Sequence, residues 1–192
     1  FQFTNTNGEN YMYIAIRRGP LADPENATDV FAMDSNGLSA NSEGVYFTSN
    51  FPVDFTINKE RTHTSDPWIV MSRLQGNGNY IDSSGSSAEA TGISNGKFDR
   101  MTGWMDSGSA MMSWMWKRAP NYFDVVCHTG DGTTNRAIAH NLGQVPRLRI
   151  TKSRDNTLYS SWWVYYIDSG GTQTRATLSQ SPFYSNSDVV ST

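Results

Sequence analysis

The chain has 192 residues, with 15 lysines and arginines against 18 aspartates and glutamates, so its net charge is −3. This near balance argues against a nucleic-acid groove and against an anionic membrane surface. No apolar run approaches the roughly 18 residues of a membrane-spanning helix, so we expect neither a nucleic-acid partner nor membrane insertion.

The sequence predicts short strands separated by turns. No stretch keeps an apolar period of about 3.6 residues over three turns, whereas runs of β-branched and aromatic residues alternate with Gly, Asn and Asp. This pattern predicts an all-β fold of antiparallel β-sandwich or jelly-roll type. In chain order, the expected strands are Tyr11–Arg17, Asp29–Met33, Val45–Phe47, Asp54–Asn58, Trp68–Leu74, Ala110–Lys117, Phe123–Thr129, Arg136–His140, Arg147–Lys152 and Trp162–Asp168.

The chain also repeats itself. Phe55–Arg61 returns as Leu148–Arg154, 93 positions later, and Pro67–Val70 returns as Trp162–Tyr165. Ile14–Pro20 resembles Trp114–Pro120 in the same way, with an offset of 100. We therefore expect tandem modules within a longer polypeptide. Residues 1–19 would be the terminal strand of an upstream module, residues 20–118 a complete β-sandwich, and residues 119–192 a second β-sandwich truncated at its C-terminal end.

Two of the expected strands have informative patterns. In Arg147–Ile150 the apolar residues Leu148 and Ile150 alternate with arginines, so we expect both to face a core. Met111–Trp116 has apolar residues at both odd and even positions, so both of its faces are apolar. It must therefore be covered on one side by its own core and on the other by a neighbouring module or subunit. We expect Trp116 on the core side and Met115 on the other.

Few residues resemble a catalytic or metal site. Gly92–Gly96 matches the Gly-x-Ser-x-Gly elbow around Ser94, but that motif needs a strand turning sharply into a helix. His63, His128 and His140 have no close ligand spacing, and the single Cys127 is expected to be buried and inert. We therefore expect no enzymatic activity, no catalytic residue, no metal site and no cofactor.

Lys59 and Lys152 occupy matching positions and share the parity of apolar neighbours. We expect the strand to end there, with the side-chain stem packed and the ammonium group reaching water. A buried lysine–carboxylate pair is the alternative.

The polar stretch Gln75–Gly108 is predicted to be a long loop that could carry binding. Trp104 within it is expected to be exposed, whereas Trp68 and Trp163, aligned in the repeat, are expected in the core. The candidate binding surface consists of Trp104, Tyr80, Asn77 and Asn79.

Several motifs occur in an order that resembles a known family. These are Phe123–Gly132, Ile138–Pro146, Ile150–Arg154 and Trp162–Tyr165, with Tyr11–Arg18 resembling a terminal strand and Trp114–Pro120 a junction. Together they look like a module repeated in long virion proteins of tailed bacteriophages. The first module departs from this pattern, because Asn41–Phe51 lacks the His-Asn-Leu-Gly element.

The resemblance implies a virion structural protein on the tail or another exterior structure, and it supplies no catalytic residues. We expect a tail fibre or tail-tip component that serves as a rigid spacer and in host attachment. Its partners would be other virion proteins or copies of itself in a homo-oligomer, together with a host surface glycan or protein. The alternative is a carbohydrate-binding module that uses exposed aromatic residues.

Overall fold

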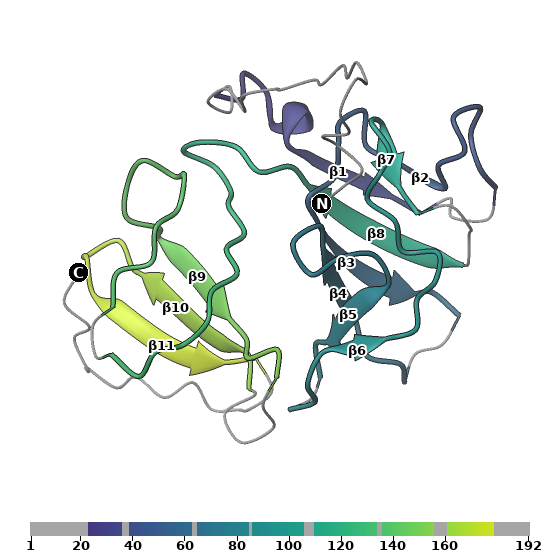
Figure 1. The fold of residues 1–192 in the computed structure, drawn as a ribbon. Helices are drawn as coiled ribbons and strands as arrows, with labels where there is room; N and C mark the ends of the chain where they lie inside the picture. The colour runs from purple at the N-terminus through teal and green to yellow at the C-terminus, as the bar shows by residue number, and fades with distance from the viewer. Residues whose placement is uncertain are drawn as a thin grey trace, which may run out of the picture.

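The computed structural model describes residues 23–35, 39–62, 65–84, 86–105, 110–133, 136–155 and 161–178. These residues form antiparallel strands and one short 3₁₀ turn at Ala27–Asp29, which confirms the all-β prediction (Figure 1). None of them belongs to a helix long and apolar enough to cross a membrane. The strands are β1 (Phe31–Asp34), β2 (Phe47–Thr48), β3 (Phe55–Glu60), β4 (Ile69–Ser72), β5 (Asn79–Asp82), β6 (Ala90–Thr91), β7 (Gly103–Trp104), β8 (Met111–Trp116), β9 (Leu148–Thr151), β10 (Trp163–Ile167) and β11 (Gln173–Thr177).

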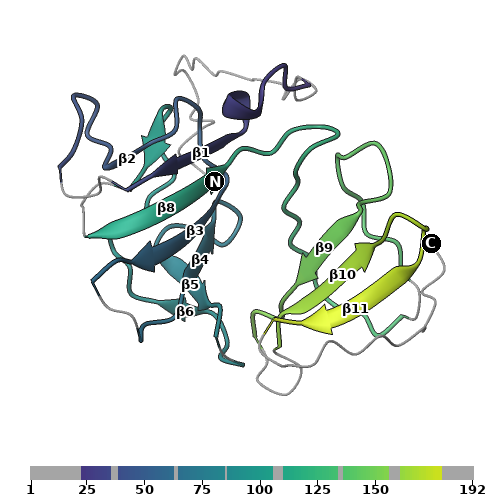
Figure 2. The ribbon, with the colours of Figure 1, turned by 180° about the vertical axis from the view of Figure 1, so that it is seen from behind.

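Two groups of strands are connected by an extended segment, as Figures 1 and 2 show from opposite sides. The first group contains a six-stranded sheet of order β1-β8-β3-β4-β5-β6 and the two-stranded sheet β2-β7. The second group is the three-stranded sheet β11-β10-β9, hereafter the second sheet. The predicted strand Tyr11–Arg17 lies outside the described residues.

The main core lies between the inner face of the six-stranded sheet and the small sheet β2-β7. Met115 and Met71 project from the large sheet and are 0% exposed, and they pack with Phe47 and Trp104. The two small strands approach very closely at Gly103, where a Cβ atom would lie 2.1 Å from the carbonyl oxygen of Phe47. Only glycine fits there, so this pairing depends on residue 103 having no side chain.

The outer face of the six-stranded sheet is aromatic. Trp116 of β8 lies 5.1 Å, centroid to centroid, from Phe31 of β1 and 5.6 Å from Phe55 of β3. Phe123, from the connecting segment, stacks on Trp116 at 6.0 Å. β8 is therefore covered on both sides, as its sequence predicts, but the assignment of sides was wrong. Met115 faces the core, and Trp116 is half-buried on the outer face.

The pairing of the second sheet repeats that of β3, β4 and β5. Ile57 pairs with Val70, and Ile150, 93 positions after Ile57, pairs with Val164, 94 positions after Val70. The turn that follows repeats as well, because Ser83 N donates to Trp68 O, and Leu178 N donates to Trp162 O. Trp68 therefore corresponds to Trp162, one residue away from the alignment with Trp163 that the sequence indicated.

Several predicted elements differ from the structure. Phe123–Thr129 and Arg136–His140 are not strands, because no strand among the described residues pairs with them; Phe123 makes an isolated bridge with Ala119. The polar stretch Gln75–Gly108 contains β5, β6 and β7 and is not one long loop. Leu148 and Ile150 do not face a core, since they are 60% and 49% exposed.

Two methionines on paired strands offer a matched test of the core. Met115→Ala removes a fully buried side chain and should lower the free energy of unfolding by about 2–5 kcal/mol. Met33→Ala, on the neighbouring strand, removes a side chain that is 60% exposed and should change it by no more than about 1 kcal/mol. Urea denaturation measures both. Equal losses for the two variants would show that the core has been placed on the wrong face of β8.

Candidate functional site

The two groups of strands contact each other at Trp162, directly before β10. Its side chain is 8% exposed and packs against Val70 and Ile81 on the outer face of the six-stranded sheet, with Phe55 and Ile57 beside them. The indole Nε1 donates a hydrogen bond of 2.8 Å to the carbonyl oxygen of Asp82. The ring thus buries its apolar surface and also satisfies its one polar atom.

A charged pair lies in the same contact, which we call the joint. Arg154 Nε and Nη2 each donate to the Glu89 carboxylate at 2.7 Å, the two-pronged geometry in which guanidinium and carboxylate match best. The backbone joins the same two residues, since Glu89 N donates to Arg154 O at 2.7 Å. Gln75 Nε2 donates to the carboxylate from a third direction at 2.8 Å.

These contacts keep the pair ionised. Burial raises the pKa of the Glu89 carboxyl, but the hydrogen bonds from Arg154 and Gln75 and the charge of Arg154 together lower it more, so it lies below the usual 4.5. The hydrogen bond from the Arg154 guanidinium to Glu89 raises the pKa of Arg154 in turn. At neutral pH both groups are therefore charged, and the joint includes a complete ion pair.

The repeated lysines follow the sequence prediction only in part. Lys152 comes directly after β9, as expected, and its Nζ donates to Ser87 O at 2.8 Å across the joint. Burial lowers the pKa of this ammonium group. Lys59 lies inside β3, one residue before its end, and donates to Asp66 O. Lys152 thus adds a further polar contact to the joint.

The candidate binding surface does not assemble around an exposed tryptophan. Trp104 is 1% exposed, stacked between Phe47 and Phe98 at 5.8 and 5.5 Å, so its expected exposure was wrong. Its Nε1 donates to Ser113 Oγ at 2.9 Å, in the middle of the main core. Pairing of β7 with β2 places it there.

The other three residues of that surface lie around the turn between β4 and β5. Asn79 Nδ2 donates to Gln75 O at 2.5 Å, and Asn77 Oδ1 accepts from Phe98 N at 3.3 Å. Tyr80 is half-buried and packs against the main core. These amide groups stabilise the turn, and a binding role for them stays a prediction.

Trp68 is more exposed than its sequence suggested. It is 38% exposed and stacks on Trp114 of β8 at 4.6 Å, so the expected core position was wrong. Trp163, its supposed counterpart, is half-buried, and the guanidinium carbon of Arg175 lies over its ring, 5.0 Å from the ring centroid. The buried tryptophan of the repeat is Trp162.

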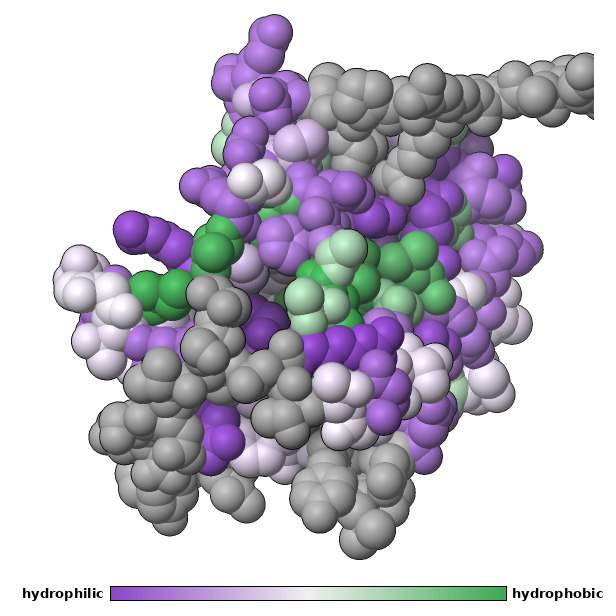
Figure 3. Space-filling model, turned by 60° about the vertical axis from the view of Figure 1, so that its left-hand side comes forward, coloured by the Kyte–Doolittle hydropathy of each residue, from purple (hydrophilic) through white to green (hydrophobic). Residues whose placement is uncertain are grey.

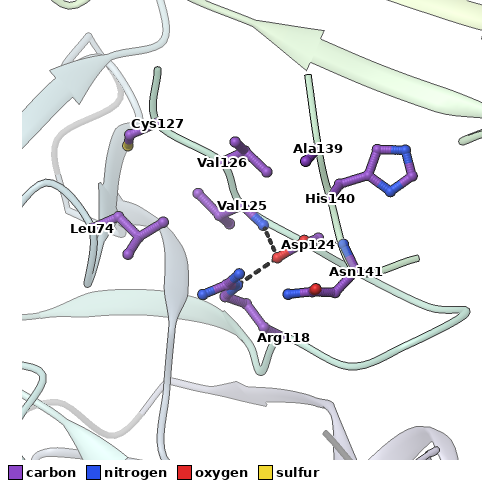
Figure 4. Close-up of a pocket in the computed structure, with 9 residues that line it drawn as sticks. All are labelled: Leu74, Arg118, Asp124, Val125, Val126, Cys127, Ala139, His140 and Asn141. Atoms are coloured by element: carbon purple, nitrogen blue, oxygen red, sulfur yellow. Dashed lines mark hydrogen bonds and ion pairs between the residues drawn. The ribbon is translucent and has the colours of Figure 1, made fainter. Parts of the chain in front are cut away.

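A cavity of about 300 Å³ lies where the connecting segment leaves the six-stranded sheet (Figure 4). Its polar wall is the ion pair of Arg118 and Asp124, whose side chains are 12% and 3% exposed. Burial raises the pKa of Asp124. The hydrogen bonds from Arg118, Asn141 N and Val125 N lower it by a larger amount, so the pKa lies below its usual 3.8. The carboxylate is thus already engaged by the chain itself, which fixes the path of the connecting segment.

The same cavity does not combine a thiol with a base. Cys127, which we expected to be buried, is exposed. Figure 4 shows its sulfur and the ring of His140 at opposite ends of the cavity, with Val126 and Ala139 between them. His140 Nδ1 accepts a hydrogen bond from Leu142 N at 3.2 Å. This arrangement does not place an imidazole where it could activate the thiol.

The remaining sequence candidates are dispersed. Ser94 lies in an exposed turn after β6, with no helix following it, and its hydroxyl contacts Asn95 Oδ1 at 3.5 Å. His128 is exposed, and His63 lies outside the described residues. Across the described ranges, no three His, Cys, Asp or Glu side chains come together as metal ligands.

Sequence reasoning missed the joint itself. The recurrence of Arg61 as Arg154 marked a position of interest, but Glu89 lies in a serine-rich stretch without any repeat signal. Comparison of the chain with protein-family models, with curated proteins and with solved structures gave no match. The residues of the joint are therefore the basis for inferring a function.

The ion pair predicts a pH dependence of stability. Because the pKa of Glu89 is lowered in the folded protein, its stabilisation is complete above the unfolded pKa and is lost as the pH falls through the folded pKa. The difference in free energy of unfolding between wild type and Glu89→Gln should be largest near about pH 7 and shrink below about pH 4.5. Glu25→Gln, which changes an exposed glutamate, should show no such trend. A difference that is equal at both pH values would mean that the carboxylate charge contributes nothing to the joint.

Proposed function

We propose that this chain is a segment of a structural protein of a bacteriophage virion, a tail fibre or tail-tip component that acts as a rigid spacer and in host attachment. In this proposal its β units are tandem sandwich-like modules. The observation that carries it is the recurrence of the β3-β4-β5 pairing in β9-β10-β11, with the two copies held together by a filled joint.

The joint supports a spacer because it resists bending. Contacts between domains of one chain are commonly polar and allow relative motion. Here, bending would have to pull Trp162, which is 8% exposed, off Val70 and Ile81 and separate Arg154 from Glu89. At roughly 25 cal/mol per Å², exposing most of a tryptophan costs about 4 kcal/mol. A spacer that must carry force requires a free-energy cost of this kind to oppose bending at each junction.

The connecting segment strengthens the same geometry. Arg118 N donates to Asp54 Oδ2 at 2.8 Å, while Arg118 also pairs with Asp124 further along the segment. Asp54 in turn binds Arg73 Nε at 2.9 Å. The segment is thus fixed to the six-stranded sheet where it begins, and the second sheet is fixed at the joint. Two points of attachment restrict rotation more than one does.

A carbohydrate-binding role is the second candidate, and one observation favours it. Trp68 presents a ring that is 38% exposed and is supported on one side by Trp114, whose partner on β1, Met33, is exposed as well. Supported, exposed aromatic rings are suited to stacking on sugars. In this alternative Trp68 takes the place that the sequence assigned to Trp104.

The virion proposal is tested by composition of purified particles. Peptides of this chain should be found by mass spectrometry in density-gradient-purified phage, in a constant ratio to the major capsid protein across the peak. Antibodies against the chain should label an exterior structure in electron micrographs. Peptides that occur in infected-cell lysate but disappear on purification would contradict the proposal.

The two candidates are separated by a glycan array. A carbohydrate-binding module should retain specific glycans, and Trp68→Ala should abolish that retention because the stacking ring is lost. Tyr122→Ala, which removes another exposed aromatic ring, is the matched control and should leave it unchanged. Glycan binding that survives Trp68→Ala would rule out this ring as the binding platform.

A further inference from the structure

One face of the second sheet carries uncovered apolar side chains. Leu148 is 60% exposed and Ile150 49%, and they pair with Tyr166 and Val164 of β10, so the four lie side by side. Leu178, directly after β11, is 57% exposed. Figure 3 shows the side of the molecule that carries the second sheet, where green hydrophobic side chains interrupt a hydrophilic surface. We call Leu148, Ile150, Val164 and Tyr166 the open face.

The repeat shows what covers this face elsewhere. By the shared register, Leu148, Ile150 and Val164 correspond to Phe55, Ile57 and Val70. In the six-stranded sheet these three positions lie beneath or beside Trp162. Leu148 and Ile150 thus repeat positions that a tryptophan covers in the first copy, and both are exposed in the second. Ala176, at the position of Ile81, is a smaller residue and is buried.

The chain also contains the matching tryptophan. Trp68 directly precedes β4, and Trp162 directly precedes β10. The backbone carbonyl of Trp68 accepts a hydrogen bond from Ser83 N, after β5, and that of Trp162 accepts one from Leu178 N, after β11. Trp162 is 8% exposed because it lies on the preceding sheet, whereas Trp68 is 38% exposed and stacks on Trp114. One part of the chain therefore exposes the tryptophan, and another exposes apolar residues at positions that correspond to those around Trp162.

We propose that a second copy of this chain docks on the open face through its Trp68, in the way that Trp162 docks on the six-stranded sheet. The indole leaves its stack on Trp114 and packs on Leu148, Ile150 and Val164. Its Nε1 then donates to the carbonyl oxygen of Thr177, which occupies the position of Asp82 in the second sheet. The inference rests on the proposed spacer role and names the partner of its exposed end.

The proposed contact joins unlike surfaces, so it does not close on itself. Each docked copy still offers an open face to the next, which produces rows of copies and not a closed dimer. The contact area is small for a stable complex, so association should depend strongly on concentration.

Sedimentation velocity over a range of concentrations tests this. The wild-type chain should grow beyond dimers as its concentration rises. Trp68→Ala removes the tryptophan, Ile150→Lys charges the open face, and each variant alone should stay monomeric. A mixture of the two should form a dimer and nothing larger, because one variant retains the open face and the other retains Trp68.

The controls separate docking from folding and from nonspecific stickiness. Met101→Lys charges another exposed side chain, 71% exposed, and should associate like the wild type. Leu148→Lys repeats the test of the open face, and thermal melts followed by circular dichroism establish that each variant is folded. A wild type that is monomeric at every concentration, or a mixture that gives no dimer, would overturn the proposal.

Trp162→Ala distinguishes this proposal from the spacer role. Small-angle scattering should show a wider range of distances between the two groups of strands in this variant than in the wild type. If the wild type stays monomeric while Trp162→Ala loosens the chain, docking between copies fails and the spacer proposal stands. If Trp162→Ala leaves the range of distances unchanged, the joint does not hold the two groups of strands together and the spacer proposal fails.

Discussion

The six-stranded sheet depends on β8, which inserts between two strands that are distant in sequence. Trp116 pairs with Phe31 of β1 on one side and with Phe55 of β3 on the other. A slip of one residue would turn Met115 outward and Trp116 inward, and it would separate the Ser113 hydroxyl from Trp104 Nε1 in the core. The register of β8 is therefore fixed by packing on one face and by a buried hydrogen bond at the same time.

A sheet with two apolar faces requires two covers, and this requirement connects the fold to the proposed role. The small sheet β2-β7 covers the inner face of the six-stranded sheet. The outer face is covered by Phe123 and Trp162, which both come from later parts of the chain. Among the described residues, the outer face of the first group is thus covered in part by the connecting segment and in part by the second group. A unit built in this way is suited to assembly in series and poorly suited to standing alone.

The sequence predicted what depends on local pattern and missed what depends on distant partners. The strands β3, β8 and β10 are rich in aromatic and β-branched residues and were located within a few positions. In contrast, β6 and β7 are two residues long, and they exist because Asn79 and Phe47 lie opposite them. Phe123–Thr129 has strand-like residues but no paired neighbour, so its propensity did not decide its structure.

The functional residues follow the same division. The burial of Trp104 depends on stacking against Phe47 and Phe98, and the residues next to Trp104 in sequence do not indicate either contact. The repeat was visible, but aligning Trp68 with Trp162 needed the strand register, because a shift of one residue moves a side chain to the other face. Glu89 could not be identified at all, since its role is defined by Arg154 and Gln75, which are distant from it in sequence.

Docking of a tryptophan on a sheet face should be stronger within one chain, as at the joint, than between separate copies. Within the chain, the connecting segment holds Trp162 close to the six-stranded sheet, so the contact forms at a high effective concentration and needs no large area. Between separate copies the same residues would have to offset the full entropic cost of association. Arg154 and Glu89 add an ion pair to the contact within the chain, and that pair fixes orientation as well as distance. Covalent linkage therefore makes the order of units along one chain permanent, whereas the proposed contacts between chains would be reversible.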